Sequence, residues 1–195
     1  MLEKVTIPEG KAGKWSIQRF TVSDEQAELE RLRGMFRSGR FTPAGTYTSL
    51  TCAGRGVVMS DVPDEMRDHR EAVRQATGHV LINGLGLGMV LAAVLKRPEV
   101  TSVTVVELDA DVISLVAPHY SDARLSIVHA SAFDYQPPKA IRYGAVWHDI
   151  WDSICADNLP EMTRLKRKYG RRANWQGCWC EYECRRNAKS GSSWS

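Results

Sequence analysis

The sequence predicts an α/β protein with a Rossmann-like, doubly wound and mostly parallel sheet, preceded by a small helix and hairpin region. Four short apolar runs are continuous rather than alternating, which is typical of strands buried on both faces. Stretches with helical periodicity separate these runs, and that order favours right-handed crossovers between parallel strands. The first run ends in a glycine cluster. The expected strands are residues 80–83, 103–106, 125–128 and 144–147, with helices over 89–95 and 112–116.

The segment before this sheet, residues 1–77, is expected to form a small region of its own. Its first 20 residues are mixed in character and predict an extended or irregular arm. Ser23 and Gln26 have capping-box spacing, so we expect an amphipathic helix over residues 24–36. The other expected elements are a hairpin over 46–50 and 56–60 and a helix over 63–75 that opens with a proline.

Length and composition narrow the class of protein. With 195 residues, 43% hydrophobic and 25% charged, the chain suits one globular domain with a small appendage. Its net charge of +3 makes no general case for nucleic acid, and no apolar run approaches a membrane span. The first residues lack a signal-peptide core, and five cysteines, an odd number, favour reduced thiols. We therefore expect a cytoplasmic protein with no membrane partner.

The glycine cluster predicts a ligand-binding loop. Gly84, Gly86 and Gly88 stand between a strand and a helix, where the backbone can turn sharply and approach a ligand. Glu107 ends the second strand, 19 residues after Gly88, where a carboxylate can accept hydrogen bonds from ribose hydroxyls. Met89 replaces the small residue of the nicotinamide dinucleotide fingerprint, which disfavours an oxidoreductase. A tight turn that binds nothing is the alternative.

A second loop follows the fourth predicted strand. Ligands of doubly wound sheets bind beyond the carboxyl ends of the strands, where the strand order reverses. If the first strand lies between the second and the fourth, Asp149 faces the glycine loop and can orient an amine or take its proton. Trp151 offers an aromatic face to a cation or an adenine. Helix capping is the alternative for Asp149 and Asp152, and His148 would point to the opposite side.

Residues 79–153 resemble the cofactor domain of the spermidine synthase family, within the class I S-adenosylmethionine-dependent methyltransferase superfamily. The glycine loop and the segment Val106-Glu107-Leu108-Asp109, with Val112 three residues later, follow the family's pattern. Asp122-Ala123-Arg124-Leu125 is similar to the family's entry to the third strand. Residues 143–152 are similar to its Tyr-Asp-hydrophobic-hydrophobic-x-x-Asp-x-x-Asp segment.

This resemblance implies a transferase, either a methyltransferase or a spermidine synthase-like aminopropyl transferase. The implied cofactor is S-adenosylmethionine or a decarboxylated analogue, bound by a domain over residues 78–157. The implied partner is a small-molecule acceptor, for which an amine is a candidate, and no metal is implied. The implied donor-binding residues are Gly84, Leu85, Gly86, Gly88, Glu107, Leu108, Ser131 and Ala132, and the implied catalytic residues are Asp149 and Asp152.

Three features depart from the family. Ala130-Ser131-Ala132 stands where the family has Gly-Asp-Ala, so the charge beside the adenine is lost. Residues 64–70 match the family's polyamine-side Asp-Glu-x-x-Tyr-His-Glu only in part. A complete sheet of this superfamily has seven strands, but four are placed before Asp149 and no clear run follows it. We therefore expect a truncated sheet whose acceptor side is completed by residues 1–77 or by a second subunit of a homodimer.

The C-terminal segment, residues 158–195, supports a second hypothesis. Residues 164–172 are basic and precede several aromatic residues, a combination that suits phosphate contacts and base stacking. The alternative function is therefore a catalytically silent nucleoside-binding module that contacts nucleic acid. A solvated helix face with anchoring aromatics is the simpler interpretation. No metal is expected at the cysteines of this segment, whose spacing matches no standard zinc site: Cys178, Cys180 and Cys184.

Overall fold

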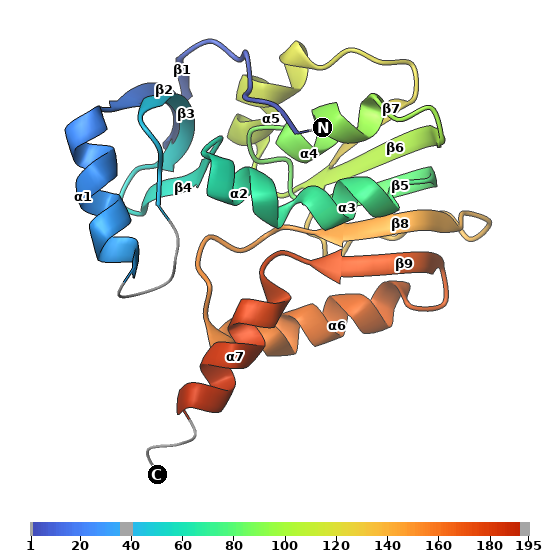
Figure 1. Ribbon diagram of the computed structural model, residues 1–195. Coiled ribbons are helices and arrows are strands. Elements are labelled where there is room, and N and C mark those ends of the chain that lie inside the picture. The colour runs from blue at the N-terminus through green and yellow to red at the C-terminus, as the bar shows by residue number, and fades with distance from the viewer. Residues whose placement is uncertain (1, 36–40, 192–195) are drawn as a thin grey trace.

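The computed structural model describes residues 2–35 and 41–191 and contains two sheets (Figure 1). The N-terminal sheet is antiparallel with the order β1-β2-β3-β4, and the second sheet is parallel with the order β7-β6-β5-β8-β9. The antiparallel strands are β1 Gly10–Ala12, β2 Trp15–Val22, β3 Gly45–Cys52 and β4 Gly56–Ser60. The parallel strands are β5 Gly78–Asn83, β6 Val100–Glu107, β7 Leu125–His129, β8 Tyr143–His148 and β9 Ala173–Cys178.

The N-terminal sheet corrects one prediction. The first 20 residues are not an irregular arm, because β2 pairs with β3 along its whole length, from Trp15 opposite Cys52 to Val22 opposite Gly45. Trp15 and Ile17 point into the core from alternate positions of β2, as expected for a strand with one buried face. The predicted hairpin is confirmed as β3 and β4.

Helix α1, Asp24–Met35, lies between β2 and β3. The capping box is confirmed: the Ser23 amide donates to Gln26 Oε1 and the Gln26 amide donates to Ser23 Oγ. The prediction of an amphipathic packing face is wrong for the described side chains, since Leu29 is 48% exposed and Leu32 is 47% exposed. Phe36, which was expected to end this helix, lies outside the described residues.

The helix predicted over residues 63–75 is divided in two. Helix α2 is Pro63–Asp68 and helix α3 is Arg70–Gln75, with His69 as the junction (φ −91°, ψ −5°). The side chain of His69 has no exposed surface. The break turns this residue toward the interior, which a sequence pattern of helical period does not reveal.

The parallel sheet has helices on both faces, which confirms the predicted doubly wound α/β fold. Alternate side chains of β5 point to opposite sides: Val80 and Ile82 pack with α3, α4 and α5, whereas Leu81 packs with α6. Helix α7 packs against α6 (Figure 1). The helices of this part are α4 Met89–Leu95, α5 Ala110–Val116, α6 Leu159–Tyr169 and α7 Glu181–Gly191, with 3₁₀ helices η1 Ala117–His119 and η2 Ala156–Asn158.

Strand β9 was not predicted. It pairs in parallel with β8 and makes a fifth strand after Asp149, where no further strand was expected. Its sequence, Ala-Asn-Trp-Gln-Gly-Cys, contains no apolar run, because β9 is an edge strand whose side chains are mostly half-buried or exposed. Trp175 of this strand stacks on Trp147 of β8, with ring centroids 6.3 Å apart.

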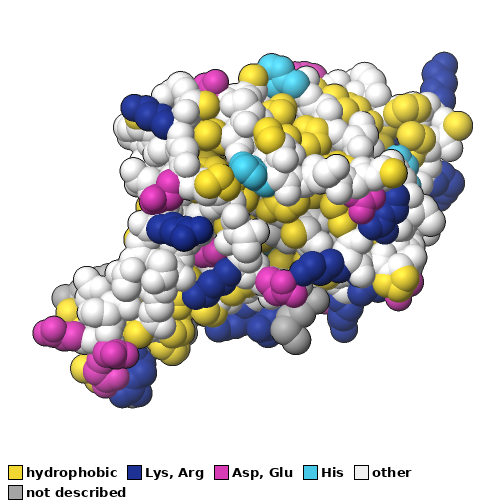
Figure 2. Space-filling view, turned by 90° about the horizontal axis from the view of Figure 1, so that it is seen from above, with side chains coloured by type: hydrophobic (Ala, Val, Ile, Leu, Met, Phe, Trp, Pro, Cys, Tyr) yellow, Lys and Arg dark blue, Asp and Glu magenta, His cyan; other side chains and the backbone are white. Residues whose placement is uncertain are grey.

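The surface carries charges of both signs. Figure 2 shows basic and acidic side chains interspersed on one face, with hydrophobic side chains exposed between them. This mixture agrees with the small net charge of +3. Within residues 2–35 and 41–191, no helix combines the length and the apolar character that crossing a membrane would require.

Candidate functional site

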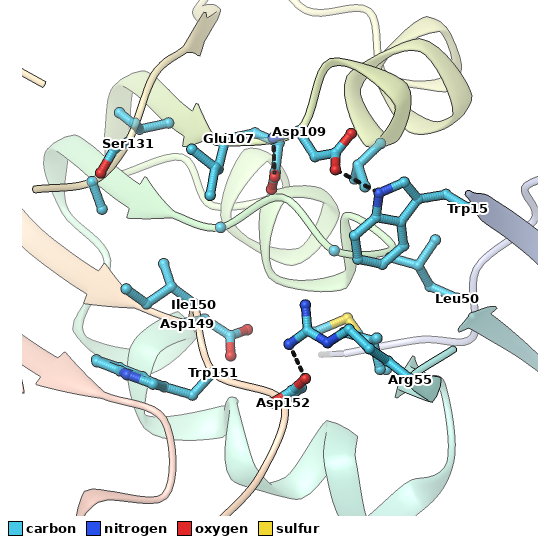
Figure 3. A pocket seen from close by; sticks show the side chains of 18 of the residues that line it. Trp15, Leu50, Arg55, Glu107, Asp109, Ser131, Asp149, Ile150, Trp151 and Asp152 are labelled. Atoms are coloured by element: carbon cyan, nitrogen blue, oxygen red, sulfur yellow. Dashed lines mark hydrogen bonds and ion pairs between the residues drawn. The ribbon is translucent and has the colours of Figure 1, made fainter. Parts of the chain in front are cut away.

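A pocket of about 360 Å³ lies at the carboxyl ends of the parallel strands (Figure 3). One wall consists of the loops that follow β5, β6, β7 and β8, and the other consists of side chains from β2, β3 and β4. Strand β5 lies between β6 and β8, so the strand order reverses at this point, as the position of Asp149 required. The pocket therefore occupies the place where ligands of doubly wound sheets bind.

The glycine loop makes two close approaches that exclude side chains. Gly84 has a φ of +100°, and a Cβ at this position would overlap the carbonyl oxygen of Asp149. Gly86 has a φ of +51°, and its Cβ would lie 2.5 Å from Met59 Sδ of β4. The first approach joins the two loops on either side of the strand-order reversal, and the second joins the glycine loop to the N-terminal sheet.

Four of the five backbone amides of the glycine loop donate hydrogen bonds within the chain. Gly84, Leu85, Leu87 and Gly88 supply these donors. The Gly84 amide donates to Val106 O, and the Leu85 amide donates to Glu107 Oε2. The Leu87 amide donates to Met59 Sδ, and the Gly88 amide donates to Leu85 O. A pyrophosphate, which binds through several such amides, would find few donors here. This arrangement is a further argument against a dinucleotide ligand, which Met89 already disfavoured.

Glu107 is fixed at the carboxyl end of β6 by two backbone amides. Its Oε2 accepts from the Leu85 amide and its Oε1 accepts from the Asp109 amide, each at 2.8 Å. A carboxylate has about four lone-pair sites, so two remain for a ligand in the pocket. The first of these bonds also ties the glycine loop to β6.

Asp109 connects this end of the pocket to the N-terminal sheet. It accepts a hydrogen bond from Trp15 Nε1 at 2.7 Å, pairs with Lys14 Nζ at 3.2 Å, and caps α5 by accepting from the Asp111 amide. Burial alone would raise the pKa of Asp109, but these donors outweigh it and the pKa is lowered. Asp109 is therefore a charged anchor for β2.

Asp149 is the buried acid of the site. Burial, followed by the nearby carboxylates of Glu65, Asp68 and Glu107, raises the pKa of Asp149 to about 8. His69 Nδ1 lies 3.7 Å from Asp149 Oδ2, but burial lowers the pKa of His69 to about 4. His69 is thus uncharged at neutral pH, and the contact is not an ion pair. Such a displaced pKa in a pocket is typical of functional carboxyl groups.

The loop after β8 is held at its two sides. Arg55, from the β3–β4 turn, makes an ion pair with Asp152 across the pocket (Figure 3). Trp151 Nε1 donates to Glu161 Oε2 at 2.8 Å, which ties the indole to the start of α6. All four of these side chains line the pocket.

The turn after β7 forms the far end of the pocket. Ser131 Oγ accepts from the Phe133 amide at 3.1 Å, so this hydroxyl stabilises the turn. Lys168 of α6 donates to the carbonyls of Ala132 and Phe133, at 3.2 Å and 2.7 Å. Helix α6 therefore supports this wall from the other face of the sheet.

Most of the residues singled out from sequence converge on this pocket. It is lined by Gly84, Gly86, Glu107, Leu108, Ser131, Ala132, Asp149 and Asp152. Leu85 is buried beneath the loop, and Gly88 lies against the ring of Tyr120, so neither lines the pocket. His148 points to the opposite face of the sheet, as expected, where its Nδ1 is 2.8 Å from Asn83 Nδ2.

The sequence did not single out the residues of the N-terminal wall. Two pocket residues, Lys14 and Trp15, come from the segment predicted as an irregular arm. Two others, Arg55 and Met59, come from the predicted hairpin, to which the sequence assigned no role. The alternation of Trp15 and Ile17 is the one signal that would have placed part of this wall on a strand.

Several basic residues of the C-terminal segment have partners within the chain. Lys166 pairs with Glu181 at 2.9 Å, and Arg172 donates to the carbonyls of Pro137 and Pro138. Lys166, Lys168 and Arg172 therefore have a structural role, which does not favour the nucleic-acid alternative. In the described part of the chain, no group of three or more His, Cys, Asp or Glu side chains is arranged to hold a metal.

No protein-family model matches the chain, and no curated protein matches it. Solved structures that match include methyltransferases, most of them described as putative, and a spermidine synthase. Spermidine synthase from Thermotoga maritima is 20% identical with a TM-score of 0.45, over 76% of this chain and 48% of that one. A putative RNA methyltransferase from Pyrococcus horikoshii is 12% identical with a TM-score of 0.46, over 67% and 64%.

A dimethyladenosine transferase from Plasmodium falciparum is 19% identical with a TM-score of 0.40, over 52% of this chain and 36% of that one. The chain thus spans less than two thirds of the length of each of these three structures.

Proposed function

We propose that the protein is a transferase that uses S-adenosylmethionine, or its decarboxylated analogue, and delivers a methyl or aminopropyl group to an amine. One observation carries this proposal. The glycine loop, Glu107 and Asp149 come from three neighbouring strand ends and line one pocket of about 360 Å³. The groups that would bind a nucleoside and a buried acid thereby share one space.

The pocket's residues fit such a donor. Its volume is within the range of small-molecule sites, roughly 300–1,000 Å³. Glu107 has lone pairs left for ribose hydroxyls, and Ser131 and Ala132 lie on the wall expected to hold the adenine. The engaged amides of the glycine loop suit a ligand without phosphate. Lys14 and Arg55 are each paired with a carboxylate, so the pocket suits a cationic sulfonium and a cationic acceptor.

The chain's own groups would orient the reactants rather than activate the donor. A sulfonium donor supplies a carbon that is already activated, so the protein contributes mainly alignment and a base. Glu107 would fix the ribose, and Asp149 would accept a hydrogen bond or a proton from the acceptor nitrogen. The side chains of β2, β3 and β4 would exclude water from above the donor.

The same proposal assigns roles to the parts of the chain. Residues 78–157 would bind the donor, and residues 1–77 would complete the acceptor side, because Met59 and Arg55 reach the pocket from β4 and the β3–β4 turn. The C-terminal segment, residues 158–195, would support the wall at Ala132 through Lys168. A homodimer is a further expectation that the oligomeric state in solution would test.

The experiment begins with the ligand that the protein retains. Mass spectrometry of the protein purified under native conditions should detect an adenosyl compound, and turnover assays with both donors and a panel of amines should then show transfer. Asp149→Asn is the matched control, since it should retain the ligand and lose turnover. Absence of an adenosyl ligand together with absence of turnover would contradict the proposal.

A further inference from the structure

His69 is a fully buried histidine that faces Asp149 from the junction of α2 and α3. Its ring meets Trp147 edge-on, with centroids 6.0 Å apart and planes at 86°. Its Nδ1 lies 3.7 Å from Asp149 Oδ2, and none of its surface is exposed. The packing therefore holds the ring beside Asp149, a carboxyl group of the pocket wall whose side chain is only 7% exposed.

Neither ring nitrogen of His69 makes a hydrogen bond to a residue that the structure describes. Buried polar atoms rarely lack partners, so such a pair of atoms beside a pocket requires an explanation. The distance to Asp149 exceeds a normal hydrogen bond by about 0.7 Å, which a small side-chain rotation removes. Hydrogen bonds of catalytic groups are often long before a ligand binds and then shorten.

The charges around this pair set its proton content. The titratable groups that act on Asp149 are Glu65 and Asp68 of α2 and Glu107 of β6, all of them acids. With its pKa near 8, Asp149 keeps its proton at neutral pH, whereas His69 is neutral because burial lowers its pKa to about 4. A neutral imidazole accepts through one nitrogen and donates through the other, and it can exchange the two roles.

We infer that His69 is a positioning residue that holds Asp149 Oδ2 in both protonation states of the carboxyl group. When Asp149 is protonated, its hydroxyl donates to His69 Nδ1, and the ring proton is on Nε2. When Asp149 loses its proton to solvent, the ring proton moves from Nε2 to Nδ1, which then donates to the carboxylate. Oδ1 is thereby kept for the acceptor. Only this role of Oδ1 rests on the proposed function.

His148 provides an internal comparison. It precedes Asp149 by one residue, has no exposed surface, and has a pKa that burial lowers to about 4, as for His69. Its Nδ1 is bonded to Asn83 Nδ2, an amide nitrogen that can only donate, so the ring proton of His148 must remain on Nε2. Gln176 Oε1, 3.5 Å from Nε2, is placed to accept this proton. Two equally buried histidines thus differ in their partners: fixed groups select one tautomer of His148, whereas no group that the structure describes selects a tautomer of His69.

The test is an NMR titration of the ¹⁵N-labelled protein from pH 6 to pH 9.5, in which ring-nitrogen shifts distinguish the two tautomers. We expect His69 to change from the Nε2–H to the Nδ1–H form with a midpoint near the Asp149 pKa of about 8. His148 should not change, and Asp149→Asn should abolish the change. A single tautomer of His69 throughout, or a change that persists in Asp149→Asn, would overturn the inference.

A second measurement tests the same role by activity. His69→Leu keeps the packing against Trp147 but removes the ring nitrogen, so it should lower kcat about tenfold and leave donor affinity unchanged. His69→Asn retains a polar atom near the position of Nδ1, so it should recover most of the lost kcat. Equal losses in both variants would contradict a positioning role. The NMR titration uses no ligand, so the two proposals can fail separately. A negative titration would not bear on donor binding, and absence of donor binding would not change the result of the titration.

Discussion

The donor side and the acceptor side of the pocket are built in different ways. On the proposed donor side, the Leu85 amide of the glycine loop donates to Glu107 Oε2, and the two groups follow or end adjacent parallel strands, β5 and β6. On the acceptor side, Asp149 meets His69 and Asp152 meets Arg55, and both partners come from residues before the parallel sheet. The proposed donor side is thus built within the parallel sheet, whereas the proposed acceptor side combines the loop after β8 with residues of the N-terminal region.

This difference indicates which substitutions should separate the two sides. Changes within the glycine loop disturb the backbone that both sides share, whereas a change at Arg55 removes a contact to the Asp149–Asp152 loop and touches neither Glu107 nor the glycine loop. Substitutions on the two sides should therefore have separable effects, and the largest is expected at Gly84, where the two sides touch.

Gly84→Ala should have the largest effect, because Gly84 is the point at which the glycine loop touches the loop after β8. A side chain there would adopt a left-handed conformation and also overlap the carbonyl of Asp149. We expect the free energy of unfolding to fall by about 3 kcal/mol or more. Chemical denaturation measures it. Gly54→Ala is the matched control: its φ is +80° but nothing lies near its Cβ position, so it should lose only about 1–2 kcal/mol. Equal losses would show that the overlap is unimportant.

Asp149→Asn should separate catalysis from donor binding. We expect turnover to fall about 100-fold or more, the usual contribution of a general base, with donor affinity changed less than about threefold. Because the pKa of Asp149 is raised to about 8, the wild-type rate should increase as the pH rises through that value. Steady-state kinetics across pH would show this limb in the wild type. Its persistence in the variant would assign it to another group.

The raised pKa of Asp149 also affects stability. The folded protein holds this proton up to about pH 8, whereas an unfolded chain releases it near the ordinary aspartate pKa of 3.8. The folded state therefore binds more protons between these values, and this group's contribution to stability is lost as the pH rises through that window. The unfolding free energy of Asp149→Asn should increase relative to wild type by at most about 1.4 kcal/mol per pH unit. Parallel pH profiles would contradict this.

Sequence reasoning predicted that the glycine loop and Glu107 lie together, because this contact is local to one β-α-β unit. The glycine loop follows β5 and Glu107 ends β6, the next strand along the chain, so the strand-loop-helix-strand pattern already predicts that they meet. His69 looked like the middle of a helix and Arg55 like part of a turn, because their roles depend on contacts with residues 80 and 97 positions away. Strand β9 was missed because an edge strand needs no apolar run.

Arg55→Ala should have the smallest effect on stability. Its ion pair with Asp152 is exposed, and such pairs contribute less than about 1 kcal/mol. We expect an increased KM for the acceptor with unchanged donor affinity, and a thermal shift that shrinks in high salt. Lys96→Ala, which breaks another exposed pair, with Glu3, is the control and should leave the KM unchanged. A loss of donor affinity in Arg55→Ala would mean that the two sides are not separate.

The central claim is that the pocket beside Glu107 binds an adenosyl donor, and isothermal titration calorimetry tests it most directly. The wild-type protein should bind S-adenosylmethionine or its decarboxylated analogue with one site per chain. Glu107→Ala should bind at least about tenfold more weakly, a loss of about 1.4 kcal/mol. The control Glu99→Ala, at the opposite end of β6, should bind as the wild type does. No heat of binding with either donor, or equal affinity in wild type and Glu107→Ala, would contradict the account.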